Sequence, residues 1–280
     1  MYRAGWRGIP LVLLRFAAAG VLLSSALSVW LVVAPSGAQA ATIDIDLVAR
    51  TASGDLIDHP YTSTGFGTAI KMGHGWGGMT ALLAGDFNGD GIDDIVACNA
   101  TGNLMLYPYT SSGFGTAVKI GSGWGSMTAM VAGDFTGDGK VDIVARSAAG
   151  YLILYPHTPA GFGTPRRIGN GWGGMTALIA GDFTGDGKVD IVARTAAGFL
   201  MLYPHTPAGF GTPVKIGNGW APMTALVAGD FTGDGNADIL ARTSTGDLIL
   251  YPHVPKKFGT PRKLTTGYGT MTALLAGHFS

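Results

Sequence analysis

The sequence predicts an all-β protein, namely a five-bladed β-propeller of four-stranded antiparallel blades, closed by pairing of its N- and C-terminal strands. Residues 41–280 divide into five units of 48 residues, and each unit holds four short apolar or β-branched runs. A period in the forties with four strands per unit is typical of a propeller blade. The 46 glycines leave no uninterrupted run long enough to favour a helix.

The four strands of a unit can be placed on the second repeat. Residues 128–134 form an apolar and small run, 141–146 a β-branched run, 151–155 an apolar run and 117–120 an alternating one. Turns rich in Asp and Gly, in Ala and Gly, in Pro and Gly and in Gly and Trp separate them. The pattern therefore predicts four strands per unit.

The two ends of the repeat region are complementary fragments. Residues 271–280 supply a first strand without a second, and residues 46–50 supply a second strand without a first. Pairing them completes one blade and hides a strand edge. A solenoid is the competing architecture, but it would need atypical capping repeats in place of these fragments.

The first 40 residues have the parts of a secretory signal peptide. Arg3, Arg7 and Arg15 precede an uncharged run over 16–34, and the small-residue pattern at 38–40 is an A-x-A cleavage site. We expect residues 1–40 to be removed and residues 41–280 to form the secreted, extracellular propeller. An uncleaved membrane anchor is the alternative, because the apolar run is about long enough to span a bilayer.

Charge and cysteine content narrow the possible partners. Removing the signal takes three of the 18 basic residues and leaves 15 against 18 acids, all of them Asp. This balance indicates no nucleic-acid partner and no membrane partner apart from the signal segment, and a monomer is expected. Cys98 is the single cysteine, so no intrachain disulfide can form, and we interpret it as filler at a variable position.

A nine-residue Asp-rich segment recurs at 86–94, 134–142, 182–190 and 230–238, with Asp at positions 1, 5 and 9, Asn or Thr at 3 and Gly at 6. Oxygens at alternate positions of a tight turn converge, which is how a Ca²⁺ loop binds its ion. Converging carboxylates repel one another without a cation. The alternative is an Asp-Gly turn that binds nothing, which accounts for position 5 better than for positions 1 and 9.

The segment between two strands, as in residues 84–96, resembles the FG-GAP/VCBS repeat of integrin-α-like propellers. This resemblance covers essentially the whole region after the signal, and it implies calcium in the loop between the first and second strands of a blade, opposite the usual ligand face. It implies about four Ca²⁺ sites, with these ligands: Asp86, Asn88, Asp90, Ile92, Asp94; Asp134, Thr136, Asp138, Lys140, Asp142; Asp182, Thr184, Asp186, Lys188, Asp190; Asp230, Thr232, Asp234, Asn236, Asp238.

The fifth copy of the loop departs from this pattern. His278 and Ser280 fill positions 1 and 3, Thr42 falls at position 5, and only Asp44 and Asp46 remain across the chain break. We therefore expect the fifth loop to be empty or weak in calcium binding.

An aromatic residue recurs at the same place in every unit, in the column Trp76, Trp124, Trp172, Trp220 and Tyr268. These rings could stack on a sugar, with Asn170 or Asn218 bonding to its hydroxyls. Alternatively, each ring is a wedge that packs between adjacent blades. Sequence alone leaves both interpretations open.

Three classes of function follow. The first is a multivalent, lectin-like carbohydrate-binding protein, comparable in architecture to five-bladed lectins of the tachylectin-2 type. The second is an integrin-like adhesion or protein-interaction scaffold that uses unrepeated charges such as Lys256, Lys257, Arg262 and Lys263. A hydrolase is least favoured, because the chain has no Glu, no nucleophile elbow and no zinc signature. The expected partners are glycans or an extracellular protein.

Overall fold

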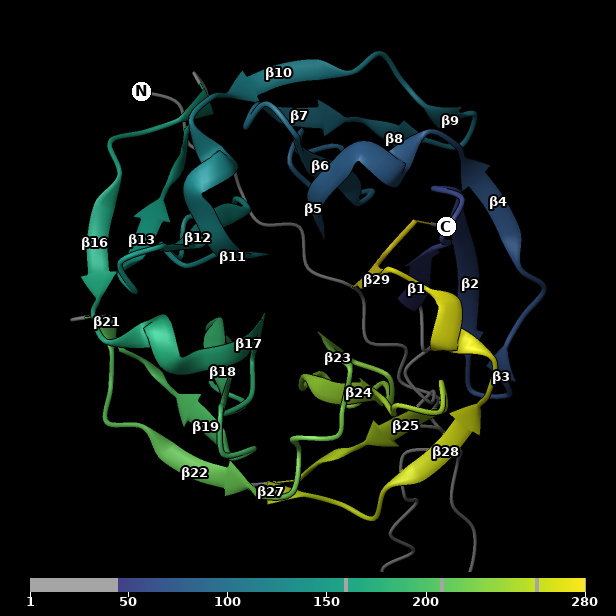
Figure 1. The fold of residues 1–280 in the computed structure, drawn as a ribbon, viewed down its shortest axis with the longest axis vertical. Coiled ribbons are helices and arrows are strands. Elements are labelled where there is room, and N and C mark those ends of the chain that lie inside the picture. The colour runs from purple at the N-terminus through teal and green to yellow at the C-terminus, as the bar shows by residue number, and fades with distance from the viewer. Residues whose placement is uncertain (1–44, 159–160, 207–208, 255–256, 280) are drawn as a thin grey trace, which may run out of the picture. The chain divides into compact units, whose positions relative to one another are not determined.

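The computed structural model describes residues 45–158, 161–206, 209–254 and 257–279. Within them the strands form a ring of five antiparallel sheets (Figure 1), which confirms the predicted all-β propeller. The helical segments found in this part of the chain are single 3₁₀ turns, η1 (Trp76–Gly78), η2 (Trp124–Ser126), η3 (Trp172–Gly174) and η4 (Tyr268–Thr270). The predicted signal peptide and the loop residues Thr42, Asp44 and Ser280 lie outside the described residues.

Each blade contains four principal strands, ordered from the ring centre outward. Blade 1 consists of β29 (Ala273–Gly277), β1 (Ile45–Arg50), β2 (Leu56–Thr62) and β4 (Ile70–Gly73); blade 2 of β5 (Met79–Gly85), β6 (Asp94–Asn99), β7 (Leu104–Tyr107) and β10 (Val118–Gly121); blade 3 of β11 (Met127–Gly133), β12 (Asp142–Ser147), β13 (Leu152–Tyr155) and β16 (Arg166–Gly169); blade 4 of β17 (Met175–Gly181), β18 (Asp190–Thr195), β19 (Leu200–Tyr203) and β22 (Val214–Gly217); blade 5 of β23 (Ala225–Gly229), β24 (Asp238–Arg242), β25 (Leu248–Tyr251) and β28 (Arg262–Thr265).

A small hairpin extends the third strand of each blade. Blade 1 forms it between β2 and β3 (Gly65–Phe66). The other blades use separate strand pairs, namely β8 (Tyr109–Thr110) with β9 (Gly113–Phe114), β14 (His157–Thr158) with β15 (Gly161–Phe162), β20 (His205–Thr206) with β21 (Gly209–Phe210), and β26 (His253–Val254) with β27 (Lys257–Phe258).

The ring closes where the two ends of the repeat region meet. β1 pairs antiparallel with β29, with Asp46 opposite Gly277 and Arg50 opposite Ala273. The same register joins the first two strands of an uninterrupted blade, where Gly85 lies opposite Asp94. Blade 1 is therefore assembled from both ends, as the complementary fragments predict, and both of its strand edges at this point are paired.

The five innermost strands surround the ring axis. Each of β5, β11, β17, β23 and β29 contacts its two neighbours around the ring. Residues of these strands, such as Leu82, Met130 and Leu226, line a central space of about 180 Å³, and all of the described residues in its wall are apolar. The described side chains at the centre of the ring therefore include no acid, base or nucleophile.

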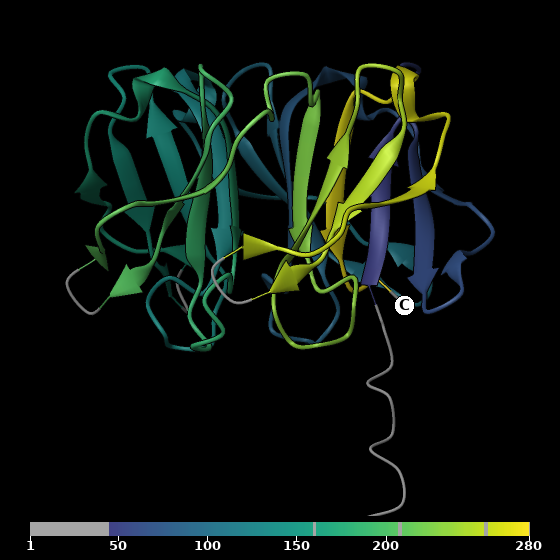
Figure 2. The same cartoon turned by 90° about the horizontal axis from the view of Figure 1, so that it is seen from below.

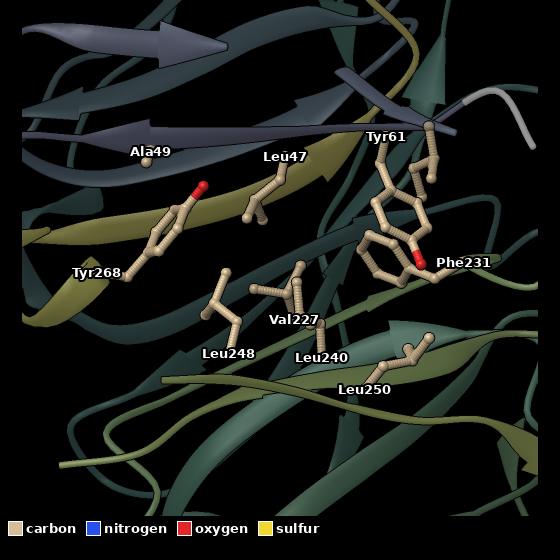
Figure 3. Close-up of a cluster of buried hydrophobic side chains, with 10 residues drawn as sticks. Leu47, Ala49, Tyr61, Val227, Phe231, Leu240, Leu248, Leu250 and Tyr268 are labelled. Atoms are coloured by element: carbon tan, nitrogen blue, oxygen red, sulfur yellow. The ribbon is translucent and has the colours of Figure 1, made fainter. Parts of the chain in front are cut away.

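The hydrophobic core lies between the blades. At the junction of blades 5 and 1, Leu47 of β1 and Leu248 of β25 are fully buried, and they pack with Phe231 and Tyr268 (Figure 3). The other junctions hold equivalent clusters. Because every blade buries both faces against neighbours, each apolar strand depends on the closed ring for its stability.

The antiparallel strands separate two kinds of loop (Figure 2). The Asp-rich loops join the first and second strands of a blade at one end of the ring, together with the small hairpins, and the Trp turns lie before each first strand at the other end. Among the described residues, no helix is both long and apolar enough to cross a membrane.

Candidate functional site

The Asp-rich loops are closed by backbone hydrogen bonds to their first aspartate. Asp86 Oδ1 accepts from the backbone N–H of Gly89 at 2.6 Å and of Asp90 at 3.1 Å, and its Oδ2 accepts from Gly91 at 2.9 Å. Gly89 and Gly91 have φ of 81° and 90°, a conformation that glycine adopts without strain. The same three bonds recur at Asp134, Asp182 and Asp230.

The ninth aspartate ties each loop to the rest of its blade. Asp142 is fully buried, and its Oδ2 accepts from the backbone N–H groups of Phe135 (3.0 Å) and Thr136 (2.9 Å). Its Oδ1 accepts from His157 of the hairpin at 2.7 Å. Backbone hydrogen bonding therefore accounts for Asp at positions 1 and 9, which an Asp-Gly turn alone does not explain.

The donor chemistry of the loops suits a hard cation, although their carboxylates do not converge. No group of three or more acidic, His or Cys side chains in the described part of the chain is arranged to hold a metal. Thr232 Oγ1 and Asp238 Oδ2 of the fourth loop are buried, and the Thr232 hydroxyl lies close enough to the Asp238 carboxylate to oppose the rise in its pKa. Burial raises the pKa of Asp94 and of Asp238 to about 6, an effect that nearby carboxylates reinforce.

The aromatic column is buried between the blades. The four tryptophans are each 5% exposed and Tyr268 is 6% exposed. The Trp172 ring lies 4.2 Å from the Tyr203 ring of the blade that follows it, and the Trp124 ring lies 4.3 Å from that of Tyr155. This is the position expected of a wedge, and it leaves no open ring face for stacking on a sugar.

The column is positioned by a glycine turn in the preceding blade. The carbonyl oxygen of Gly150 accepts from the backbone N–H of Trp172 at 2.9 Å. Gly150 has φ of 76°, and a Cβ there would lie 2.7 Å from the backbone nitrogen of Gly173. Asn170 and Asn218, the proposed sugar-bonding residues, are exposed beside the buried rings.

An arginine whose role was not predicted from the sequence joins four of the five aromatic turns to the preceding blade. Arg194 donates from Nη1 to the carbonyl oxygens of Trp220 (3.1 Å) and Met223, and its Nε donates to Thr176. Arg50, Arg146 and Arg242 make the same contacts at three other junctions. Cys98 takes this position between blades 2 and 3. The sequence signal that could have revealed this contact is the recurrence of Arg at the end of the second strand of a unit.

A Tyr-Pro-His sequence recurs at residues 155–157, 203–205 and 251–253, and its tyrosines pack in the clusters between blades. The histidines of these segments are half-buried in the hairpins, and the backbone N–H of His205 donates to Asp190 Oδ1 at 2.7 Å. The ring of His253 lies within 3.0 Å of the Phe183 carbonyl oxygen of the preceding blade. His157 Nδ1 and His205 Nδ1 are buried without a partner among the described residues.

In the described part of the ring, recesses of several hundred Å³ open at two junctions between blades. The recess between blades 1 and 2 has a volume of about 440 Å³ and is lined by Trp76, Tyr107, Phe114, His74 and Ser112, among others. The recess between blades 3 and 4 has a volume of about 350 Å³ and lies on the side of the Asp-rich loops. Volumes of a few hundred Å³ suit small ligands.

Together, the closed ring and the recesses between its blades define the class of protein: a β-propeller binding module. The chain matches the FG-GAP-like repeat over residues 86–145, 134–193 and 182–241, more than half of its length. It belongs to the FG-GAP-like repeat family. No curated protein sequence matches it.

Solved structures with a similar fold include a lectin, and a toxin chain is a weaker match. An Agrocybe aegerita lectin, described as recognising non-reducing terminal N-acetylglucosamine, is 17% identical with a TM-score of 0.52. The match covers 82% of this chain and 65% of the lectin, so the chain spans less than two thirds of the lectin's length. The Photorhabdus luminescens Tc holotoxin pore is 16% identical with a TM-score of 0.47, over 84% of this chain and 12% of the toxin chain.

Proposed function

We propose that this protein is an exported, calcium-stabilised propeller that binds glycans in recesses between its blades. The observation that carries the proposal is the recess between blades 1 and 2. Its wall combines Trp76 and Tyr107 with the exposed residues His74 and Ser112. Flat apolar rings beside a few polar groups suit a sugar, which has an apolar face and a rim of hydroxyls.

A sugar bound in this recess would not stack on the aromatic column, as was considered from the sequence. Because the indoles are buried, a sugar would lie in the recess against an aromatic edge, and the polar loops would supply its hydrogen bonds. Equivalent turns recur around the ring, so weak sites on one rigid body would gain avidity on a multivalent surface. The Agrocybe lectin is a precedent for sugar recognition on this fold, although fold alone does not establish function.

Calcium would bind in the Asp-rich loops. The oxygens offered at positions 1, 3, 5, 7 and 9 are carboxylates, amides, hydroxyls and carbonyls, which are the ligands that Ca²⁺ prefers. In the fourth loop, the buried oxygens Thr232 Oγ1 and Asp238 Oδ2 would be among its ligands. Its contribution would be structural, because it would hold together a loop that joins two strands.

Glycan-array screening of the secreted chain, followed by calorimetry on the best sugar, tests the glycan proposal. We expect His74→Ala combined with Ser112→Ala to weaken binding at the first recess. The matched control is Ser122→Ala, at the position in the next unit that corresponds to His74. An array on which no glycan binds would contradict the proposal.

A protein-interaction scaffold is the second candidate, and the observation that favours it is the unrepeated charge of the last unit. Lys257 is exposed. Two other charges of this cluster are already engaged, since Lys263 pairs with Asp247 at 2.9 Å and Arg262 donates to the Tyr61 hydroxyl at 2.9 Å. Lys256 lies outside the described residues. A partner captured by the wild type and lost with Lys257→Glu would support this candidate; a hydrolase remains the least favoured proposal.

A further inference from the structure

The recess between blades 3 and 4 differs chemically from the other junctions. Its wall includes Arg166, Arg167 and Ile168 of β16, Thr136 of the second Asp-rich loop, and His205 and Thr206 of the hairpin of blade 4. None of the described residues that line it is acidic. Asp138, an exposed carboxylate of the same Asp-rich loop as Thr136, is paired with Lys140 at 3.2 Å.

Two arginines, Arg166 and Arg167, border this recess, and they differ in their partners. Arg166 lies opposite Leu154, whose side chain packs in the cluster between blades 3 and 4. The guanidinium carbon of Arg167 lies 3.6 Å from the centre of the Tyr151 ring, so its charge is already stacked on an aromatic face. Within the described residues, Arg166 has neither a hydrogen bond nor an ion pair, and its guanidinium donors remain available.

His205 adds a second unpartnered polar group to the same wall. Its backbone N–H is held by Asp190, which fixes the hairpin, and its ring lies edge-on to Phe210 at 5.9 Å. The ring atom Nδ1 is buried without a partner in the described chain. A buried polar atom without a partner is costly, and a ligand that bonds to it removes that cost.

The equivalent positions at other junctions show why this recess is distinctive. Between blades 5 and 1, Arg262 occupies the place of Arg166, but its guanidinium donates to the Tyr61 hydroxyl. Between blades 4 and 5 the position is Val214, and the space that remains there is about 10 Å³. In the described part of the ring, the junction of blades 3 and 4 is therefore where an arginine without a partner lies beside an open recess.

We propose that this recess binds the anionic group of an acidic glycan, a sulfate ester or a carboxylate, through Arg166 and His205, with the hydroxyls of Thr136 and Thr206 beside it. The proposal deepens the glycan-binding function and rests on it for the sugar part of the ligand. Guanidinium is the cation best suited to bond both oxygens of such a group. The recess, at about 350 Å³, has room for the sugar that bears it.

The first experiment measures the anion alone. Thermal unfolding of the whole chain is followed while sodium sulfate replaces sodium chloride at constant ionic strength. We expect sulfate to stabilise the wild type more than Arg166→Val, a change that introduces the residue found at Val118 and Val214. Arg262→Val is the matched control: it removes the same charge at the equivalent position, and we expect it to respond to sulfate like the wild type.

The second experiment separates the two sources of the anion. Calorimetry compares N-acetylglucosamine with N-acetylglucosamine 6-sulfate and with glucuronic acid. A charged hydrogen bond is worth about tenfold in affinity or more, so at least one acidic sugar is expected to exceed the neutral one by about tenfold, and Arg166→Val to abolish that difference.

The outcomes of the two proposals are distinguishable. Binding of neutral sugars with no preference for either acidic sugar, or an equal preference in Arg166→Val, would overturn the anion site and leave glycan binding intact. An Arg166-dependent response to sulfate without binding of any sugar would support the anion site and contradict the glycan function. Equal responses to sulfate in the wild type and Arg166→Val would also overturn the anion site.

Discussion

Arg146, at the end of β12, donates a hydrogen bond from Nη1 to the carbonyl oxygen of Trp172 in the next blade, at 3.3 Å. Its Nε donates to the Thr128 hydroxyl within blade 3 at 2.8 Å. One side chain thus joins the edge of a blade to the turn that positions the neighbouring wedge. Because the contact is made to backbone carbonyls, it tolerates changes in the side chains of the turn.

The junction between blades 2 and 3 lacks this contact. Cys98 stands where the other units carry arginine, and a cavity of about 150 Å³ opens beside Trp124, Met127 and Thr80. We predict that Cys98→Arg raises the free energy of unfolding by about 1–2 kcal/mol, because the guanidinium would bond to the carbonyl oxygens of Trp124 and Met127. Chemical denaturation of the wild type and of Cys98→Arg measures this difference in the free energy of unfolding.

The reverse substitution is the control for this prediction. Arg194→Cys, which recreates the junction of blades 2 and 3 elsewhere in the ring, is expected to destabilise the protein by a similar amount. If Cys98→Arg lowered stability while Arg194→Cys left it unchanged, the arginine contact would not contribute to ring stability.

Removal of a wedge is predicted to destabilise the whole ring. Trp172→Ala should lower the free energy of unfolding by about 3–5 kcal/mol, because it leaves a large cavity in a core shared by two blades. Asn170→Ala, an exposed neighbour in the same turn, should have little effect. Equal stability of the two variants by calorimetry would show that the indole does not support the blade junction.

A buried carboxyl in blade 1 predicts a pH-dependent stability. Asp58 occupies the position of Leu106, Leu154, Leu202 and Leu250 in the other units, and its Oδ1 has no partner in the described chain. Burial raises the pKa of Asp58 to about 7, and the charge of Asp46 adds to this, whereas a hydrogen bond from the His59 backbone opposes it. The folded state therefore favours the protonated carboxyl.

The sign follows from linkage between protonation and folding. The pKa of Asp58 is higher in the folded state than in the unfolded one. Asp58 therefore contributes fully to the free energy of unfolding below about pH 4, and this contribution, on the order of 2 kcal/mol, is lost as the pH rises through 7. Asp58→Asn should therefore gain stability relative to the wild type between pH 4 and pH 8. Asp58→Leu, which restores the residue of the other repeats, is the packing control. A constant difference across this range would contradict the prediction.

Calcium is predicted to stabilise the folded chain. An ion that binds the native loops alone raises the midpoint of thermal unfolding as its concentration increases. Asp234→Asn removes a fifth-position carboxylate that, unlike Asp138 and Asp186, is not paired with lysine. It should reduce the calcium-induced shift, whereas Asp247→Asn, an acid outside the loops, should not. An identical thermal unfolding transition with calcium and with a chelator would contradict the metal proposal.

The local and repeated features could be predicted from the sequence. The 48-residue period gives five blades, and the runs at 128–134 and 141–146 give two strands that the structure pairs, with Gly133 opposite Asp142. The complementary fragments at the two ends give the closure of β1 on β29. These features follow because strand pairing and turns depend on residues near one another in a repeat or related by its period.

Contacts across the junctions could not be predicted in the same way. The sequence leaves Trp172 equally suited to a surface site and to a core, and only its burial against Tyr203 of blade 4 distinguishes them. Asp142 reads as a candidate metal ligand, yet in the structure both of its oxygens accept backbone hydrogen bonds. The direction of a side chain within a junction depends on the neighbouring blade, which no single repeat contains.

The sequence by itself therefore determined the number of blades, their strand order and the closure of the ring, because these depend on periodicity and on unpaired strand edges. Tertiary structure alone decided that the aromatic column is a buried wedge, that Cys98 interrupts a series of arginine contacts, and that Arg166 faces an open recess while Arg262 is engaged by Tyr61. The physical reason is that equivalent residues acquire different roles when adjacent blades place different partners against them.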